Sequence, residues 1–416
     1  MNKKSYICVL LAVCIIFTYS AAAFSYNAKG VCVVEMESGD ALIEKNADIS
    51  FTPASLTKIM TLYILYEKLE SGEITKDTVI YASSNAQALS KPSDASNIPL
   101  VAGKGYSVDL MIKAMVVPSA CAVCTMFAEY VSGSEAQFAL LMNEKAAELG
   151  LTAYFTDASG LSDYNLITPR SVAKLVRLFI QKYPDILNYT SIKEITVDGK
   201  VYKNTNLLLS DKKYYEGADG FKTGTTSIAG KCLAATAQRD GTRIISVSMG
   251  SSTDKNRYAD ATEALNNGFG RANYLNSTIF STDIRTFING AEIPCYYFLG
   301  KEKALLLIAE ELRGYGFDTT YSAAENTLYI SNNSKKIFTP IEREEEKQSG
   351  LEKYKIYMKS KPRVILKTMQ GDVELKTVYS LNGLCMISVD ELAKNYAYLW
   401  DNDTRSANIT LNIGDV

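Results

Sequence analysis

The segment that organises this sequence reads Phe51-Thr52-Pro53-Ala54-Ser55-Leu56-Thr57-Lys58-Ile59-Met60. Pro53 and Ser55 predict the start of a helix that runs to about Glu70, because apolar residues then recur at helical spacing. Ser55 and Lys58 are three residues apart, which places both side chains on one face of that helix. A second short motif, Lys222-Thr223-Gly224, lies far downstream.

The chain of 416 residues contains no histidine. This excludes Ser-His-Asp and Cys-His centres, so a hydrolase built from this sequence needs another base. A lysine one helical turn after a serine is the known substitute. A free lysine has a pKa of about 10.4, and burial together with the charge of Lys222 is expected to lower that of Lys58. A lone Ser-x-x-Lys also occurs at ordinary helix starts, so the second motif decides the interpretation.

Bulk composition limits the class of protein. The length predicts two or three domains, and 47% hydrophobic with 22% charged residues indicates a globular chain. A formal net charge of −2 argues against a nucleic-acid partner. Lys3 and Lys4 followed by an apolar run predict a signal peptide over residues 1–23, although retention as a membrane anchor stays open. We therefore expect a secreted protein outside the cytoplasmic membrane, and association with the cell wall or the membrane surface stays open.

Six cysteines follow the predicted signal peptide. Cys121 and Cys124 lie one helical turn apart, but without histidine or a second pair they are weak evidence for a metal. Cys32 and Cys232 lie in apolar, strand-like runs and are expected to be buried free thiols. No metal and no cofactor is expected.

The order of elements predicts an α+β domain over residues 24–275. A hairpin over residues 31–45 precedes a mostly helical stretch, 107–182, and short strands follow from residue 192. Asp240-Gly241 between two apolar runs is a strong hairpin signal. A closing helix is expected over about 253–267.

The remainder, residues 276–416, contains an internal repeat. Residues 289–293 resemble 370–374, and 311–330 resemble 391–411. A period of roughly 80 residues is too long for a solenoid, so we expect a duplicated α+β module with one shared core. Each unit is predicted as strand, strand, helix, strand, and the charged stretch 342–347 as a linker between them.

The downstream motif supplies candidate substrate contacts. Gly224 lets a substrate backbone approach the strand edge. Lys222 and Thr223 are expected to hold a substrate carboxylate. The N–H groups of Thr225 and Ser55 are expected to form an oxyanion hole.

Residues 53–61 resemble the active-site segment of the serine D-Ala-D-Ala carboxypeptidases, the low-molecular-mass penicillin-binding proteins. Residues 44–47, 159–161 and 217–224 match further segments of that family in order, so the resemblance covers about residues 28–272. It implies a penicillin-binding/β-lactamase-like fold, in which an antiparallel sheet is flanked by helices and joined by a helical subdomain. Residues 276–416 faintly resemble copper-amine-oxidase N-terminal-like domains, and this implies no copper.

The resemblance also implies roles for particular residues. Ser55 is the acylated nucleophile, Lys58 its general base, and Ser119 relays protons. Lys222 and Thr223 bind the terminal carboxylate. The family has Asn where this chain has Cys121, whose thiol is a poorer hydrogen-bond donor and acceptor for the base and substrate.

Three hypotheses follow. The first is an exported carboxypeptidase that trims the terminal D-alanine of peptidoglycan stem peptides and is covalently inhibited by β-lactam antibiotics. The second, motivated by Cys121, is a catalytically weak or silent scaffold that binds wall peptides. The third is a β-lactamase, for which the sequence offers no convincing general-base glutamate.

Overall fold

The computed structural model describes residues 25–91, 95–282, 284–300, 303–333, 353–355, 363–368, 371–381, 384–401 and 406–410. The predicted signal peptide and the predicted linker, 342–347, lie outside these ranges. The chain divides into two compact units, Met1–Gly268 and Phe269–Val416. The division falls within helix α9 (Asp254–Asn276), which runs past its expected end at about residue 267. Each unit is described by itself.

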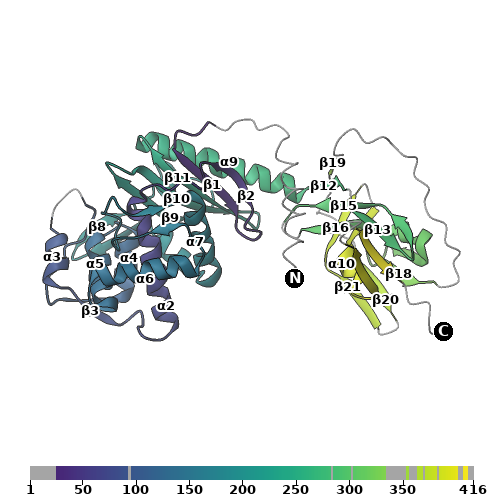
Figure 1. Ribbon diagram of the computed structural model, residues 1–416, viewed down its shortest axis with the longest axis horizontal. Coiled ribbons are helices and arrows are strands. Elements are labelled where there is room, and N and C mark those ends of the chain that lie inside the picture. The colour runs from purple at the N-terminus through teal and green to yellow at the C-terminus, as the bar shows by residue number, and fades with distance from the viewer. Residues whose placement is uncertain are drawn as a thin grey trace. The chain divides into compact units, whose positions relative to one another are not determined.

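The first unit is built on a five-stranded antiparallel sheet in the order β2-β1-β11-β10-β9 (Figure 1). Its strands come from the two ends of the unit, as the hairpin signals predict: β1 (Gly30–Glu35), β2 (Ala41–Lys45), β9 (Ala218–Thr226), β10 (Gly230–Arg239) and β11 (Thr242–Ser251). Asp240 and Gly241 both have positive φ, which the tight β10–β11 turn requires.

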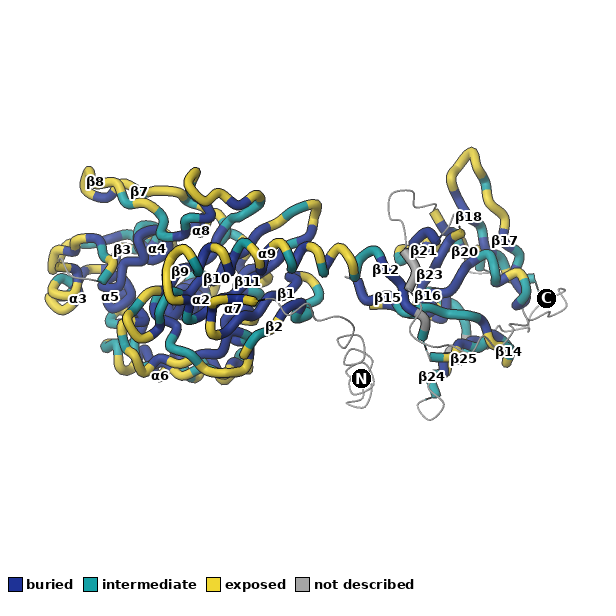
Figure 2. Tube along the Cα trace, turned by 90° about the horizontal axis from the view of Figure 1, so that it is seen from above, coloured by how far each residue is buried: buried dark blue, intermediate teal, exposed yellow. Residues whose placement is uncertain are grey.

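Helices cover both faces of this sheet. Every residue of β1 is buried: Cys32 and Val34 pack into the main core, whereas Val33 contacts α9 where it passes at Gly268. The opposite face is covered by α7 (Pro169–Lys182), which contacts β1, β10 and β11. Figure 2 shows the buried strands between these partly exposed helices. A strand that is covered on both faces has a continuous apolar sequence, as β1 has over residues 30–34.

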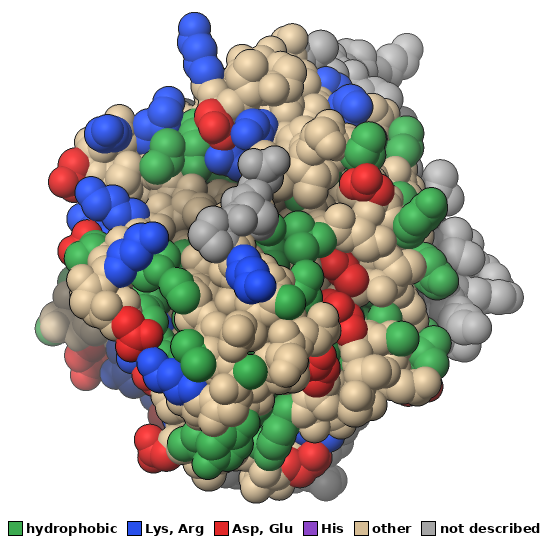
Figure 3. Space-filling view, turned by 90° about the vertical axis from the view of Figure 1, so that its left-hand side faces the viewer, with side chains coloured by type: hydrophobic (Ala, Val, Ile, Leu, Met, Phe, Trp, Pro, Cys, Tyr) green, Lys and Arg blue, Asp and Glu red, His purple; other side chains and the backbone are tan. Residues whose placement is uncertain are grey.

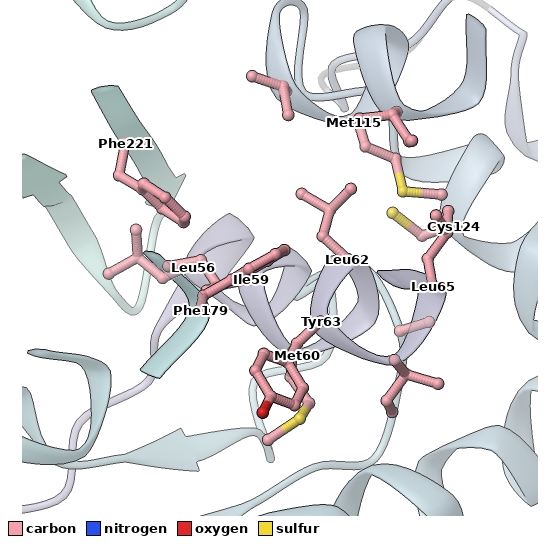
Figure 4. Packing of buried hydrophobic residues seen from close by; sticks show 14 of the residues in the cluster. Leu56, Ile59, Met60, Leu62, Tyr63, Leu65, Met115, Cys124, Phe179 and Phe221 are labelled. Carbon is pink, nitrogen blue, oxygen red and sulfur yellow. The ribbon is translucent and has the colours of Figure 1, made fainter. Parts of the chain in front are cut away.

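The helical part between the sheet's strands surrounds α2 (Lys58–Glu70), whose first nine residues are all buried. A helix that is buried on every side belongs at the centre of a domain. Ile59, Leu62 and Tyr63 pack against side chains of other elements, among them Phe179 and Phe221 (Figure 4). The rings of Tyr63 and Phe179 meet edge to face at 5.4 Å. This packing fixes the segment that carries Ser55 and Lys58.

The other elements of the first unit include helices and strands at the predicted positions, over residues 108–148 and 194–203, and short elements that the sequence pattern did not predict. They are η1 (Ala54–Thr57), α3 (Ser84–Leu89), α4 (Val108–Val116), α5 (Cys121–Ser132), α6 (Glu135–Glu148), α8 (Ile186–Thr190), η2 (Leu207–Leu209), and three short ladders: β3 (Val79–Tyr81) with β4 (Gly105–Ser107), β5 (Ala153–Tyr154) with β6 (Leu166–Ile167), and β7 (Glu194–Val197) with β8 (Lys200–Lys203). On the side of the first unit that carries α3 and β3, basic, acidic and hydrophobic side chains are interspersed (Figure 3).

The second unit consists of two halves with the same order of elements. Its strands and helical turns are β12 (Thr278–Ser281), β13 (Arg285–Ile288), β14 (Ala291–Ile293), β15 (Cys295–Phe298), β16 (Ala304–Ile308), η3 (Ala309–Tyr315), β17 (Phe317–Ser322), β18 (Thr327–Asn332), β19 (Lys353–Lys355), β20 (Arg363–Thr368), β21 (Gly371–Leu375), β22 (Val378–Leu381), β23 (Leu384–Ser388), α10 (Val389–Ala393), β24 (Ala397–Asp401) and β25 (Ser406–Thr410). Each half has two hairpins, a short helical turn and a third hairpin. The expected strand-strand-helix-strand unit therefore omitted strands, because strands this short carry little periodic signal.

Hairpins of the first half pair with hairpins of the second half in shared sheets. Hairpin β13–β14 of the first half pairs with β24–β25 of the second, and β17–β18 pairs with β20–β21. Equivalent ion pairs, Arg285–Glu292 and Arg363–Glu374, cross the first hairpin of each half. Two hydrophobic clusters each contain residues of both halves, such as Leu312 and Leu392 in one and Phe298 and Tyr379 in the other. Neither half buries its apolar surface without the other.

Candidate active site

The proposed nucleophile lies on a tight turn that leads into the central helix. Ser55 belongs to the 3₁₀ turn η1, and Lys58 is the first residue of α2. Ser55 is half-buried and Lys58 is fully buried. The Nζ atom of Lys58 donates a hydrogen bond to Ser55 Oγ over 2.9 Å. The spacing of three residues thus brings the two side chains together, as the sequence predicts.

Two further groups accept hydrogen bonds from Lys58. The carbonyl oxygen of Ser159 lies 2.7 Å from Nζ, and the Sγ atom of Cys121, at the start of α5, lies 3.3 Å away. Cys121 is 3% exposed. The side chain that occupies the family's Asn position is therefore in direct contact with the proposed base.

A second buried lysine reaches the same site from β9. Lys222 is 2% exposed, and its Nζ donates to Ser119 Oγ at 2.8 Å and to the carbonyl of Thr223 at 3.0 Å. Ser119 has φ of +63°, in the left-handed region that a non-glycine residue adopts only where the surroundings enforce it. Ser119 and Cys121 flank Ala120, so one short segment presents the hydroxyl to Lys222 and the sulfur to Lys58.

The two lysines have opposite pKa shifts. Burial, and then the positive charge of Lys58, hold the pKa of Lys222 well below its usual value. Burial also acts to lower the pKa of Lys58, but the sulfurs of Cys121 and Cys124 and the hydrogen bond to Cys121 raise it above its usual value. The expectation of a lowered pKa at Lys58 was therefore wrong. It overlooked the sulfurs, which attract the ammonium form.

The glycine of the second motif allows β9 to touch the nucleophile turn. A Cβ atom on Gly224 would lie 2.6 Å from the carbonyl oxygen of Pro53 and 3.2 Å from the nitrogen of Ser55. Any side chain there would push β9 away from the turn. Thr223 Oγ1 and Thr205 Oγ1 share a hydrogen bond of 2.6 Å, and Thr225 is exposed. β9 is the last strand of the sheet, so its outer edge is available to an extended ligand.

Two residues of the site have no motif in the sequence. Arg257, on α9, is 6% exposed and donates to the carbonyl of Gly224 at 3.3 Å and to Thr225 Oγ1 at 3.2 Å. It also pairs with Asp254, and its Nε has no partner. The second is Asp157, whose carboxylate organises the loop that contains Ser159. Neither spacing nor composition distinguishes these residues from ordinary surface charges.

Cys32 and Cys232 are buried free thiols, as predicted. Within the described ranges, His, Cys, Asp and Glu side chains nowhere gather in a group that suits a metal ion.

Comparison with known proteins identifies the family. Residues 17–253 match the family model described as D-alanyl-D-alanine carboxypeptidase. The chain belongs to this family. It is 32% identical over 283 residues to the D-alanyl-D-alanine carboxypeptidase DacF of Bacillus subtilis, an alignment covering 64% of this chain and 71% of DacF. It is 34% identical over 249 residues to DacC of Escherichia coli, covering 59% of this chain and 62% of DacC.

Solved structures agree with this assignment. The ampicillin-bound penicillin-binding protein D2 of Listeria monocytogenes is 30% identical, with a TM-score of 0.53 over 59% of this chain and 99% of that one. Penicillin-binding protein 6B of E. coli is 28% identical, with a TM-score of 0.57 over 63% of this chain and 81% of that one. The predicted fold class and the predicted class of enzyme, a serine peptidase of the carboxypeptidase type, are confirmed.

Proposed function

We propose that this protein removes the terminal D-alanine from peptidoglycan stem peptides through an acyl-enzyme on Ser55. The observation that carries the proposal is the 2.9 Å hydrogen bond between Lys58 Nζ and Ser55 Oγ, together with a second buried Lys–Ser pair, Lys222 and Ser119. Family membership supports the substrate class. The reaction is expected to take place outside the cytoplasmic membrane, after export. Among the described residues, no helix is both long and apolar enough to cross a bilayer.

The chemistry follows from the two Lys–Ser pairs. Ser55 Oγ attacks the carbonyl carbon between the last two residues, and its proton passes to the neutral amine of Lys58. The C–N bond breaks as Ser119 gives a proton to the leaving nitrogen and recovers one from Lys222. Water then attacks the ester, its proton restores Lys222, and Lys58 returns the first proton to Ser55.

This scheme requires Lys58 neutral and Lys222 charged, whereas the pKa shifts favour the reverse distribution of the shared proton. The reactive form is then a minority of the resting protein. The sulfur of Cys121 causes this, because it favours the charged form of Lys58. Slow acylation is the expected consequence.

The free carboxylate of the substrate would lie along the outer edge of β9. Thr223 and the exposed Thr225 offer hydroxyl donors, and the Arg257 guanidinium beside Thr225 adds a positive charge. The N–H groups of Ser55 and Thr225 are proposed to receive the oxyanion. A β-lactam, whose carboxylate and amide resemble those of the peptide end, would acylate Ser55 in the same way.

Labelling with a fluorescent penicillin tests the proposal. Mass spectrometry should place the adduct on Ser55, and Ser55→Ala should abolish it. A D-Ala-D-Ala peptide should release D-alanine in a Ser55-dependent manner. The absence of an adduct at saturating label would refute the enzyme proposal.

The contact between Cys121 and Lys58 also favours a second candidate function, a wall-binding scaffold with little or no turnover. Slow acylation without D-alanine release would support that candidate. Sustained hydrolysis of nitrocefin would instead indicate a β-lactamase.

A further inference from the structure

The loop that touches Lys58 is organised by one carboxylate. This loop, residues 156–165, joins β5 to β6. The side chain of Asp157 accepts hydrogen bonds from five groups, namely Ser159 Oγ (2.9 Å), Gly160 N (2.9 Å), Leu161 N (2.9 Å), Ser162 N (3.2 Å) and Asn165 Nδ2 (2.5 Å). A carboxylate that accepts several backbone N–H groups fixes a loop strongly, because such charge-assisted hydrogen bonds are about twice as strong as neutral ones.

The same loop supports the nucleophile turn at two points. The carbonyl oxygen of Ser159 accepts the 2.7 Å hydrogen bond from Lys58 Nζ. Next to it, Gly160 has φ of +85°, and a methyl group there would overlap the carbonyl oxygen of Ala54. The backbone of residues 159–160 is thus pressed between the proposed base and the residue that precedes Ser55.

Other contacts hold the two ends of the loop, and at its far end Asn165 Nδ2 donates to Thr57 Oγ1 at 3.3 Å. Ala158 N donates to Glu135 Oε1 at 3.1 Å, and Thr61 Oγ1 donates to the carbonyl of Ala158 at 2.6 Å. None of these contacts reaches residues 159–162. Residues 159–162 donate four hydrogen bonds to Asp157, and Thr156 Oγ1 adds one to Ser162 Oγ at 2.7 Å, so the position of this stretch depends mainly on the carboxylate.

We propose that Asp157 is a positioning residue for the general base. Its carboxylate holds the Ser159 carbonyl against Lys58 and the Gly160 backbone against the Ser55 turn. The inference rests on the proposed function, because it assigns to Asp157 an effect on acylation through Lys58. The proposed role differs from a purely stabilising one, because it predicts changes in the acylation rate and in its pH dependence.

Asp157 acts through geometry and through charge. Loss of its hydrogen bonds releases the Ser159 carbonyl, and Lys58 Nζ then samples positions away from Ser55 Oγ. A displacement of about 1 Å of a reacting group can cost on the order of a hundredfold in rate. Its negative charge also favours the ammonium form of Lys58. Removing that charge lets the neutral amine persist at lower pH.

The other titratable groups around this site stay constant in the test. Those that face Lys58 or Asp157 come from α5, β9 and α6, namely Cys121, Cys124, Lys222 and Glu135.

The experiment measures the rate of acylation by a fluorescent penicillin from pH 5 to 10. Wild type is compared with Asp157→Ala, Asp157→Asn and the control Glu35→Ala. Glu35 is also a buried carboxylate that holds a turn, because it accepts a hydrogen bond from Ser38 N at 2.6 Å. That turn follows the last residue of β1. Thermal melting of each variant reports its stability separately.

We expect Asp157→Ala to lower the plateau rate by about tenfold to a hundredfold, with partial rescue in Asp157→Asn, whose amide oxygen still accepts. In both variants the acid limb of the profile should move to lower pH. Glu35→Ala should melt earlier than wild type but keep its rate and profile. If Asp157→Ala does not fold, Asp157→Asn carries the test through its reduced plateau and shifted limb.

Two failures are distinguishable. If wild type forms no adduct on Ser55, the proposed function is wrong. If wild type is acylated but the Asp157 variants behave like Glu35→Ala, the function stands and the positioning role is refuted.

Discussion

Lys58 Nζ lies 3.3 Å from Cys121 Sγ and 2.9 Å from Ser55 Oγ, so the proposed base is shared between a sulfur and the nucleophile. An amide at this position offers a donor and an acceptor, whereas a thiol is weak in both capacities. The sulfur also stabilises the charged form of Lys58, which cannot accept a proton from Ser55. This one contact therefore governs how reactive the site is.

The first prediction concerns Cys121→Asn. The amide should restore a polar contact and remove the sulfur that raises the pKa of Lys58. One well-placed contact contributes about 1–3 kcal/mol, so the acylation rate should rise tenfold to a hundredfold. Stopped-flow acylation measures this, with Cys385→Ala in the second unit as the control. An unchanged or lower rate would show that the thiol suits this site and that the family's Asn role does not transfer.

The second prediction concerns thiol reactivity. Burial raises the pKa of Cys32 and of Cys124 to about 12 and that of Cys232 to about 11, so these thiols should resist alkylation at pH 8. Cys121 should react slowly from the active-site side, and prior acylation by penicillin should protect it. Alkylation should block acylation of wild type but not of Cys121→Asn. Peptide mapping by mass spectrometry quantifies each site.

If acylation by penicillin does not protect Cys121 from alkylation, Cys121 lies outside the route by which ligands enter the site. Rapid alkylation of Cys32 or Cys124 in the folded protein would contradict their burial.

The third prediction concerns Gly224→Ala. The new methyl group would lie 2.6 Å from the Pro53 carbonyl and must push β9 from the Ser55 turn. Overpacking of this kind costs about 1–3 kcal/mol of unfolding free energy, and acylation should fall by at least about tenfold. Gly270→Ala is the matched control, because a methyl group there meets nothing within 4 Å. It should slightly stabilise α9 and leave acylation unchanged. Equal behaviour of the two variants would contradict the contact.

The fourth prediction concerns Glu135, at the start of α6. Burial, and to a lesser extent the nearby charge of Asp157, raise the pKa of this carboxyl. A raised pKa means that folding favours the protonated form, so the associated stability is full below the unfolded pKa and is lost as pH rises through the folded value. Glu135→Gln imitates the protonated form and should melt higher than wild type at pH 7. The difference should vanish towards pH 4, and a difference independent of pH would refute the assignment.

The sequence alone determined the class of chemistry and most of the fold. With histidine absent, Ser55 and Lys58 had to be read as a pair, and a spacing of three residues on a helix brings them together whatever surrounds them. Hairpin signals such as Asp240-Gly241, and apolar runs such as β1, likewise depend on local backbone geometry and burial. Features that depend on local backbone geometry and burial can therefore be predicted from the sequence alone.

Only the tertiary structure decided what surrounds the pair. Cys121, Asp157 and Arg257 lie far from Ser55 in sequence, and only folding brings their sulfur, carboxylate and guanidinium to the pocket. The direction of the pKa shift at Lys58 depends on these neighbours, because burial and nearby charges oppose each other and their balance is set by distance. The pairing of hairpins between the two halves of the second unit is non-local in the same sense. Sequence spacing predicts which residues can react together, whereas tertiary packing determines which neighbouring groups shift their pKa values.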